Sequence, residues 1–354
     1  MNEKSRGVTA SFILSAALLA PLSVILAAPS AARASTAEKP KVIRWIVAHD
    51  RGSSFFDQLL DTYAQKLEKK SGGALKVEFI ASKAPDTQLD AAAYQQVLNG
   101  GADMSQLSAA RAGVPIFDAP FVFRNYDHAE AVFNGPVGKK LLNGVSESSQ
   151  GRLKGYAFTY SGGYRILVGS KPLNRLSDLK GLKVRRETAS AAFLGELGAK
   201  RVDVGPEVRE RPIAAVLSGA LDLEETEVNR LALVQRDHPE LVKGISYANL
   251  TRHRMYVTSI LANEKFLAGL TAEQRRLLGE WVEELATDER KLSVDLEGRN
   301  LKALTASGLH LIELPKSERA NFMDAAKAFI KKSPELEASV REIQAVPDTR
   351  LASQ

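Results

Sequence analysis

The chain has 354 residues, of which 44% are hydrophobic, and it carries 48 lysines and arginines against 42 acidic residues. Basic and acidic residues are interleaved, and no stripe of lysine or arginine with aromatic residues occurs, so we expect no nucleic acid as a partner. The absence of cysteine excludes disulfides, thiol chemistry and a lipid-modified cysteine. A chain of this length buries a large core without such bridges, and it suits two domains better than one.

The N-terminal segment predicts a secretory signal peptide over residues 1–34. Lys4 and Arg6 precede an apolar run over about 8–28, and the small residues of an Ala-Arg-Ala sequence follow it. We expect cleavage after Ala34 and a periplasmic location. Because the apolar run is just long enough to cross a bilayer, an uncleaved membrane anchor is the alternative.

Strands and helices are expected to alternate after this segment. Apolar runs predict strands, and apolar residues at helical spacing predict the helices between them. Ser53 or Ser54 would cap the first helix and Gly72-Gly73 would end it. The alternation is typical of mainly parallel sheets covered by helices. The strands are expected over 42–48, 74–80 and 103–107, and the helices over 55–70 and 89–98.

One short pattern occurs twice. The segments 97–104 and 216–223 align without gaps, and both read as a helix end, a glycine turn and the entry into a strand. Two lobes built from similar units would explain the repeat. The alternative is that such junctions simply resemble one another.

The C-terminal third predicts one long helix of about 36 residues. Thr271 and Gln274 form a capping box at its start, and Gly308 closes it. At 1.5 Å per residue such a helix is roughly 50 Å long, so we expect it to run along both lobes. A strand over 309–314 and a helix capped by Ser317 should follow, with a partly loose tail after Pro334.

Two arginines are the strongest candidates for ligand binding. Arg165 and Arg185 lie twenty positions apart, each beside a short apolar run. A guanidinium in a cleft meets a small carboxylate through its planar fork of donors. If the two converge, the chain binds an organic acid; the alternative is a surface arginine or a structural salt bridge.

Four motifs in order resemble a known family, the substrate-binding proteins of tripartite ATP-independent periplasmic (TRAP) transporters. The resemblance covers about residues 41–335. Each motif alone is weak, but their combination and order are specific. They are KKSGG at 69–73, APFVF at 119–123, GPVG at 135–138 and DLKGLKVR at 178–185.

The resemblance implies a two-lobed α/β periplasmic binding protein of type II-like fold, with mainly parallel sheets flanked by helices and a long helix spanning both lobes. The lobes would be discontinuous. Lobe I would comprise 41–162 and 251–290, lobe II would comprise 163–250 and 291–335, and 336–354 would form a C-terminal tail.

The resemblance also implies roles for the two arginines. In the family, the arginine that ends the strand matching 183–185 pairs with the ligand's carboxylate, and the arginine twenty residues earlier assists it. These roles fall on Arg185 and Arg165. The partners implied are a small carboxylate ligand and the integral membrane subunits of a transporter.

The chain departs from the family pattern at 222–226, which reads DLEET. The usual asparagine becomes Thr226, whose hydroxyl makes fewer hydrogen bonds than an amide. Glu225 stands where the family commonly has glutamate, and Glu224 adds a negative charge. If Glu224 points inward it would favour a ligand with an ammonium group or several hydroxyls, but we expect it to point outward as a solvated acid.

Further candidates are less specific. Tyr160, Tyr164 and Tyr256 suit the walls of a cleft because a tyrosine has an apolar face and a polar tip, although they suit a core equally well. Arg111 follows a predicted strand at its carboxyl end, where ligands of open sheets gather, but a solvated arginine is the alternative.

His49 and His253 occupy predicted loop positions near the lobe junction. The five histidines are widely spread and show no metal-ligand spacing, so we predict neither a metal site nor a cofactor. Carboxylates distant in sequence could still hold a divalent ion together with the ligand.

An enzyme is the competing class of function. No HExxH, Gly-x-Ser-x-Gly or glycine-rich phosphate loop occurs, although scattered residues could still assemble a catalytic site. A module that reports its bound ligand to a membrane receptor would share the same fold and pocket. We expect a non-enzymatic solute-binding protein of a TRAP-type transporter.

Overall fold

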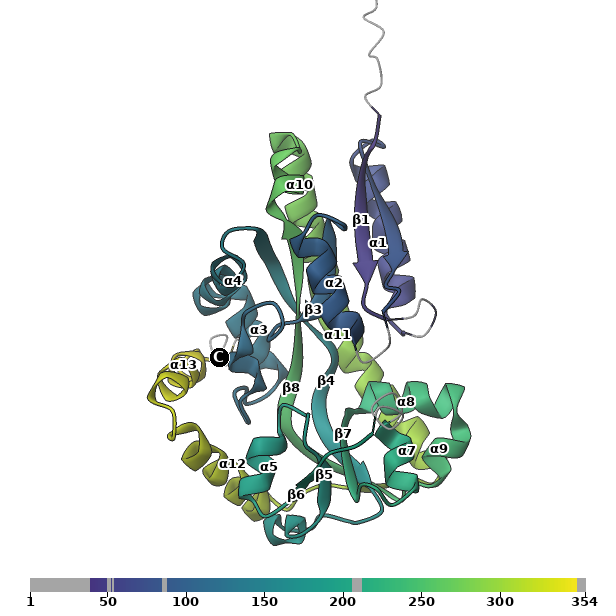
Figure 1. Ribbon diagram of the computed structural model, residues 1–354, viewed down its shortest axis with the longest axis vertical. Helices are drawn as coiled ribbons and strands as arrows, with labels where there is room; N and C mark the ends of the chain where they lie inside the picture. Colours follow the sequence, from purple (N-terminus) through teal and green to yellow (C-terminus); the bar gives the residue numbers. More distant parts are fainter. Residues whose placement is uncertain (1–38, 50–51, 53, 85–87, 206–211, 349–354) are drawn as a thin grey trace, which may run out of the picture. The chain divides into compact units, whose positions relative to one another are not determined.

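The computed structural model describes residues 39–49, 52, 54–84, 88–205 and 212–348. The predicted signal peptide and its cleavage site lie outside these residues. Within them, the α/β alternation is confirmed (Figure 1). No helix of the described chain is long and apolar enough to cross a membrane.

One sheet holds all nine strands found within the described residues. Its order is β2-β1-β3-β8-β4-β7-β5-β6, with β9 also beside β8. The outer pairs are parallel, whereas β8 runs antiparallel to β3 and β4, and β4 runs antiparallel to β7. The strands are β1 (Lys41–Val47), β2 (Leu75–Ala81), β3 (Met104–Ser108), β4 (Leu153–Gly169), β5 (Lys183–Arg185), β6 (Lys200–Val202), β7 (Leu223–Glu227), β8 (Tyr247–Asn263) and β9 (His310–Ile312).

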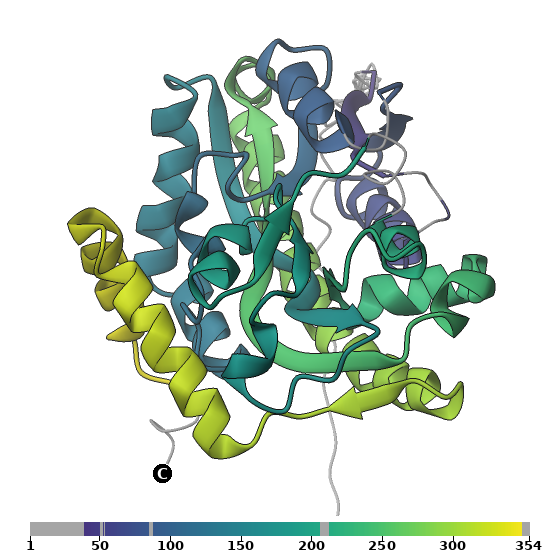
Figure 2. The same cartoon turned by 60° about the horizontal axis from the view of Figure 1, so that its bottom comes forward.

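Helices pack on both faces of this sheet, as the two views in Figures 1 and 2 show. They are α1 (Asp57–Lys70), α2 (Leu89–Leu98), η2 (Pro115–Asp118), α3 (Tyr126–Asn134), α4 (Pro136–Ser148), η3 (Leu176–Leu179), α5 (Ala191–Glu196), α7 (Pro212–Leu217), α8 (Val228–Asp237), α9 (Pro239–Lys243), α10 (Glu264–Ala268), α11 (Ala272–Ala306), α12 (Lys316–Ile330) and α13 (Pro334–Gln344). The predicted helix over 89–98 matches α2 at both ends.

Two strands of 17 residues, β4 and β8, run through the whole sheet. The sequence did not indicate them, because each contains an irregularity. In β4 the register against β8 shifts between Thr159 and Gly163, and the backbone has positive φ at Ser161, Gly162 and Gly163. In β8, Arg252 has φ +42°. These bulges re-aim the side chains that follow them.

Helix α11 confirms the predicted long helix. Thr271 and Gln274 form the expected capping box, and Gly308 follows the helix with φ +98°. Trp281, in the first half of α11, packs in a core with β1 and α1. Leu304, near its end, packs in a second core with β4, α8 and β8. One helix therefore contributes to the cores at both ends of the sheet.

The repeated pattern corresponds to a repeated structure. Asp103 donates its backbone N–H to the Arg44 carbonyl (2.8 Å), and its carboxylate accepts the Arg44 N–H (2.8 Å). Asp222 makes the same two bonds to Lys183, at 2.9 and 2.8 Å. The Arg44 and Lys183 side chains each also donate to a carbonyl of the adjacent glycine turn. The two ends of the sheet thus contain the same β-helix-β junction.

Two local predictions are wrong. Phe56 occupies the N-cap of α1 without a side-chain bond, so Ser54 is not its cap, and Ser53 lies outside the described residues. Pro315 precedes α12, so Ser317 lies inside the helix. The tail predicted to be partly loose after Pro334 contains an ordered helix, because α13 buries Val340 and Ile343 in a core shared with α3 and α4; residues 349–354 lie outside the described chain.

Candidate functional site

The candidate site begins as a row of charged residues across three strands. Arg165 in β4 pairs directly with Arg254 in β8 on one side and with Glu227 in β7 on the other. Two neighbouring guanidiniums repel each other unless carboxylates lie between or beside them. The Nη1 of Arg165 contacts Oε2 of Glu227 at 3.1 Å, which meets part of this requirement.

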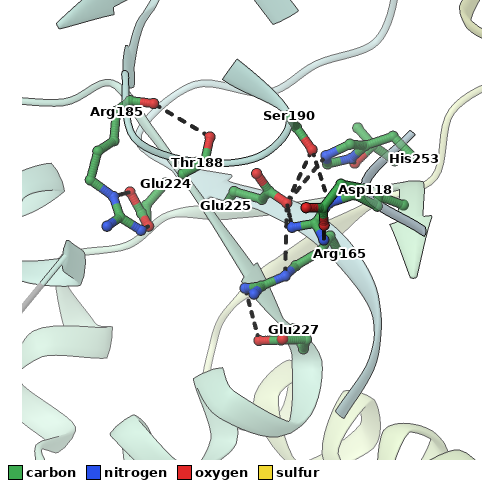
Figure 3. A network of polar contacts seen from close by, with 11 residues as sticks. Asp118, Arg165, Arg185, Thr188, Ser190, Glu224, Glu225, Glu227 and His253 are labelled. Atoms are coloured by element: carbon green, nitrogen blue, oxygen red, sulfur yellow. Dashed lines mark hydrogen bonds and ion pairs between the residues drawn. The ribbon is translucent and has the colours of Figure 1, made fainter. Parts of the chain in front are cut away.

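Glu225 supplies the bridging carboxylate. Its Oε1 lies 2.8 Å from Nη2 of Arg254 and 3.7 Å from Nε of Arg165. Arg254 also contacts Asp118 of η2 (2.9 Å) and the hydroxyl of Ser190 (3.3 Å), which precedes α5. We call Asp118, Arg165, Glu225, Glu227, His253 and Arg254 the junction cluster; Figure 3 labels all of these residues except Arg254.

Burial controls the protonation of this cluster. Burial alone would raise the pKa of the Glu225 carboxyl, but Arg254, His253 and Arg165 hold that pKa well below its usual range. Burial raises the pKa of Asp118 despite the nearby Arg254. Burial also lowers the pKa of His253 to about 4, so its ring is neutral at pH 7.

Three buried polar atoms of the cluster have no hydrogen-bond partner among the described residues. They are Nε of Arg165, Oε2 of Glu225 and Nε2 of His253. Buried polar groups are almost always satisfied, and those that are not mark places where water or a ligand completes the structure. The three atoms include a charged donor and a charged acceptor. The cluster is therefore polar and buried, and three of its polar atoms have no hydrogen-bond partner among the described residues.

Arg185 lies apart from this cluster, on the other face of β7. Its Nη2 and Nε contact Oε1 and Oε2 of Glu224 at 2.6 and 3.3 Å. Because Glu224 and Glu225 are consecutive residues of a strand, their side chains point to opposite faces. The structure does not bring Arg165 and Arg185 together, and Figure 3 shows Arg185 and Glu224 to one side of the cluster.

The expectation that Glu224 is a solvated, outward-facing acid is wrong. The residue is 2% exposed, since β7 is covered on both faces. Burial raises the pKa of its carboxyl to about 7, although Arg185 opposes that rise. Thr226 shares this face of β7 and is also buried.

The three candidate tyrosines differ in their surroundings. Tyr256 lies under the guanidinium of Arg165, 4.5 Å from it, and so borders the junction cluster. Tyr160 and Tyr164 are buried in an aromatic core with Tyr126. The hydroxyl of Tyr160 donates to Glu130 (3.0 Å), so this tyrosine is a core residue in the present geometry.

Arg111 and His49 have partners outside the cluster. Arg111 lies 3.7 Å from Asp90 and is half exposed, and His49 contacts Asp57 at 2.9 Å. His253, in contrast, is fully buried inside the cluster, 3.8 Å from Glu225. No group of three or more His, Asp or Glu residues is arranged for a metal ion within the described chain.

Sequence reasoning missed Asp118, Glu227 and, above all, Arg254. Arg254 is 5% exposed, and it contacts Asp118, Ser190 and Glu225 at once. The sequence feature that points to Arg254 is the run Arg252-His253-Arg254, which precedes an apolar stretch. In a regular strand, however, consecutive residues of this run would point to opposite faces of the sheet. The left-handed backbone at Arg252 breaks this alternation and could not be foreseen.

A family model for bacterial extracellular solute-binding proteins, family 7, matches residues 48–205 and 231–335. The chain belongs to this family. The family 7 match covers well over half of the chain and includes Arg165, Arg185 and Arg254. The interval between its two segments contains β7 and hence Glu224, Glu225 and Glu227.

Curated relatives agree with membership of family 7. The C4-dicarboxylate-binding periplasmic protein DctP of Rhodobacter capsulatus is 25% identical over 317 residues, which cover 84% of this chain and 86% of DctP. The 2,3-diketo-L-gulonate-binding periplasmic protein YiaO of Escherichia coli is 26% identical over 274 residues, which cover 73% of this chain and 76% of YiaO.

Solved structures confirm the fold. A TRAP periplasmic solute-binding protein from Ochrobactrum anthropi superposes with a TM-score of 0.73 at 22% identity, over 89% of this chain and 99% of the other. One from Roseobacter denitrificans, with bound β-D-glucuronate, gives a TM-score of 0.72 at 22% identity, over 87% of this chain and the whole of the other. The chain has the fold of two-lobed TRAP-type binding proteins.

Proposed function

We propose that this chain is the periplasmic binding component of a TRAP-type transporter, which captures a small organic acid and delivers it to integral membrane subunits. Family 7 membership supports the class of protein. The observation that carries the ligand class is the junction cluster, in which a buried guanidinium, a buried carboxylate and a buried imidazole each keep a polar atom without a partner among the described residues.

The proposed ligand site lies between the two proposed lobes. Lobe I (41–162 and 251–290) contributes Asp118 and Arg254, whereas lobe II (163–250 and 291–335) contributes Arg165 and Glu225. The ion pairs of Arg254 with Asp118 and with Glu225 therefore link one lobe to the other. A ligand bound here would touch both lobes and stabilise their closed arrangement.

The backbone supports a hinge at the same place. Ser161, Gly162 and Gly163 have positive φ where β4 passes from one proposed lobe to the other, and Arg252 does so in β8. Glu289 of α11 accepts the N–H groups of Tyr160 (3.1 Å) and Ser161 (2.9 Å) beside this passage. Closure about these residues would exclude water and strengthen the ion pairing of ligand and arginine.

Both predicted arginines keep a role in the proposal. Arg165 presents its Nε within the junction cluster. Arg185, the position that meets the carboxylate in the family by resemblance, donates its Nε and Nη2 to Glu224, and the proposal places the ligand at the remaining edge of its guanidinium. The bound acid is released chemically unchanged, since binding and closure require no reaction.

A thermal-shift screen tests the proposal. Protein purified from the periplasm is heated with organic acids, each matched with its amide or alcohol. A ligand at a hundred times its dissociation constant stabilises the folded chain by about 2.7 kcal/mol, so the melting temperature should rise with acids alone. Recovery of the acid unchanged is expected. Equal shifts with neutral analogues, or no shift with any acid, would refute the proposal.

The same preparation tests the predicted export. Intact mass should correspond to a chain that begins at Ser35. A mass that includes residues 1–34, with the protein in the membrane fraction, would favour the uncleaved anchor instead.

A further inference from the structure

The arginines around β7 are each matched by carboxylates of the chain itself. Arg185 pairs with Glu224 at 2.6 Å and Arg165 with Glu227 at 3.1 Å. Arg254 pairs with two carboxylates, those of Glu225 (2.8 Å) and Asp118 (2.9 Å). Three guanidiniums therefore face four carboxylates. Each of these guanidiniums already has a carboxylate partner within the chain.

His253, Arg111 and Arg252 do not reverse this balance. The ring of His253 is neutral because burial lowers its pKa to about 4. Arg111 lies beside Asp90 (3.7 Å), and Arg252 pairs with Glu313 (2.9 Å) and Glu297 (3.6 Å). Burial raises the pKa of Glu224 to about 7. If Glu224 is protonated, three charged carboxylates remain beside the three guanidiniums, so the positive charges still do not outnumber the negative ones.

This balance penalises a ligand that carries only negative charge. A dicarboxylate would place two more negative charges beside Glu225, Glu227 and Asp118, where water cannot screen them well. A ligand with an ammonium group beside its carboxylate adds no net charge. The atoms without partners match such a ligand: Nε of Arg165 can donate to a carboxylate, and Oε2 of Glu225 can accept from an ammonium.

Resting on the proposed function, we infer that the preferred ligand of this chain is a zwitterionic acid, an amino acid or a close derivative, with its carboxylate at Arg165 and its ammonium group at Glu225. The extra carboxylates Glu224 and Glu227 make the surroundings of this site more acidic, and Glu227 lies directly across from Arg165 in the sheet. Dicarboxylates and hydroxy acids are the disfavoured classes.

The test uses sets of three acids that differ in one substituent next to the carboxylate: ammonium, hydroxyl or hydrogen. Suitable sets are alanine, lactate and propionate; glutamate, 2-hydroxyglutarate and glutarate; and phenylalanine, phenyllactate and phenylpropionate. Dissociation constants are measured by calorimetry at pH 7.5 on periplasmically purified protein. In the set that binds, the ammonium member should bind at least about tenfold more tightly, a difference of about 1.4 kcal/mol.

The outcomes separate the two levels of the argument. Equal or tighter binding of a hydroxy acid or an unsubstituted acid overturns the zwitterion inference and leaves the proposed function intact. Failure of every acid, including those of the wider thermal-shift screen, overturns both. Binding of an amine that lacks a carboxylate, without binding of any acid, likewise overturns both.

A charge variant provides a second test. Glu227→Gln removes one negative charge next to Arg165, so the preference for ammonium over hydroxyl should fall several-fold. Glu313→Gln is the matched control, because Glu313 is exposed and pairs with Arg252 outside the cluster; the preference should stay unchanged. An unchanged preference in a folded Glu227→Gln variant contradicts the inference. If that variant does not fold, the three-acid comparison on the unaltered chain decides.

Discussion

The carboxylate of Glu224 holds the guanidinium of Arg185 through two contacts, Oε1 to Nη2 at 2.6 Å and Oε2 to Nε at 3.3 Å. This side-on geometry is the one that a ligand carboxylate adopts toward an arginine fork. In this chain an internal glutamate therefore occupies an edge of the arginine to which the family resemblance assigns the ligand. A ligand that contacts Arg185 must share the guanidinium with Glu224.

Glu224→Gln should strengthen acid binding several-fold at pH 8, because a neutral amide competes less for Arg185. Burial raises the pKa of the Glu224 carboxyl to about 7, so the carboxyl ionises as pH rises through that value and then holds Arg185 more firmly. Affinity of the unaltered chain should hence decrease from pH 6 to pH 8, whereas that of the variant should stay flat. Calorimetric titrations at pH 6, 7 and 8 measure this. Superimposable profiles would mean that Arg185 does not contact the ligand.

Arg165→Lys should weaken acid binding by about tenfold or more, although the charge is kept, because lysine lacks the planar fork and the Nε donor that the junction cluster presents. Arg186→Lys is the control: Arg186 forms an exposed pair with Asp203 and should leave affinity unchanged. Dissociation constants for the ligand found in the screen decide the matter. Equal affinity of the Arg165→Lys and Arg186→Lys variants would remove Arg165 from the site.

His253→Gln should change the pH dependence of stability. Burial lowers the folded-state pKa of His253 from 6.5 to about 4. Between these values the unfolded chain binds a proton that the folded chain does not, so His253 costs stability as pH falls, by up to about 1.4 kcal/mol per pH unit. Urea unfolding at pH 7, 6 and 5 should show that the free energy of unfolding of the unaltered chain falls relative to that of the variant as pH decreases. Parallel stability profiles would show that His253 does not titrate in this way.

Two glycines should respond in opposite directions to alanine. Gly163 has φ +90°, and a Cβ there would strike the hydroxyl of Tyr126, so Gly163→Ala should destabilise the fold by about 1–3 kcal/mol. Gly298 is exposed inside α11, and a Cβ added there would meet no atom within 4 Å, so Gly298→Ala should stabilise the fold by about 0.5–1 kcal/mol. Urea unfolding of both variants measures the effects; a tolerated alanine at 163 would argue against the tight passage of β4.

Local chemistry explains which features could be predicted from the sequence. The Thr271 capping box and the glycine turns at 100 and 219 are read from adjacent residues, and the structure confirms them. The course of β4 and β8 could not be predicted, because bulges interrupt their periodicity and their partners lie far away along the chain. The same limit applies to the site: Arg165 was predicted, but Arg254 joins it only through strand pairing.

The pairing of arginines with carboxylates was the other feature that could not be predicted from the sequence. Glu224 follows the polar pattern of a solvated residue, and only the burial of β7 on both faces turns it inward toward Arg185. Whether Arg165 and Arg185 converge depends on which face of a strand each side chain takes. The face that a side chain takes depends on where the strand ends and where a bulge interrupts it. The strand propensities of individual residues do not predict these positions well.

The pairing of β3 with β8 also determines when this part of the sheet can be completed. Met104–Ser108 lies between β1 and residues Thr258–Ala262 in the sheet, so the first part of the sheet stays open on one side until residue 262 has been synthesised. Such distant pairing delays folding. Until residue 262 is available, β3 lacks its partner on that side, so this part of the sheet cannot be completed from the N-terminal residues alone.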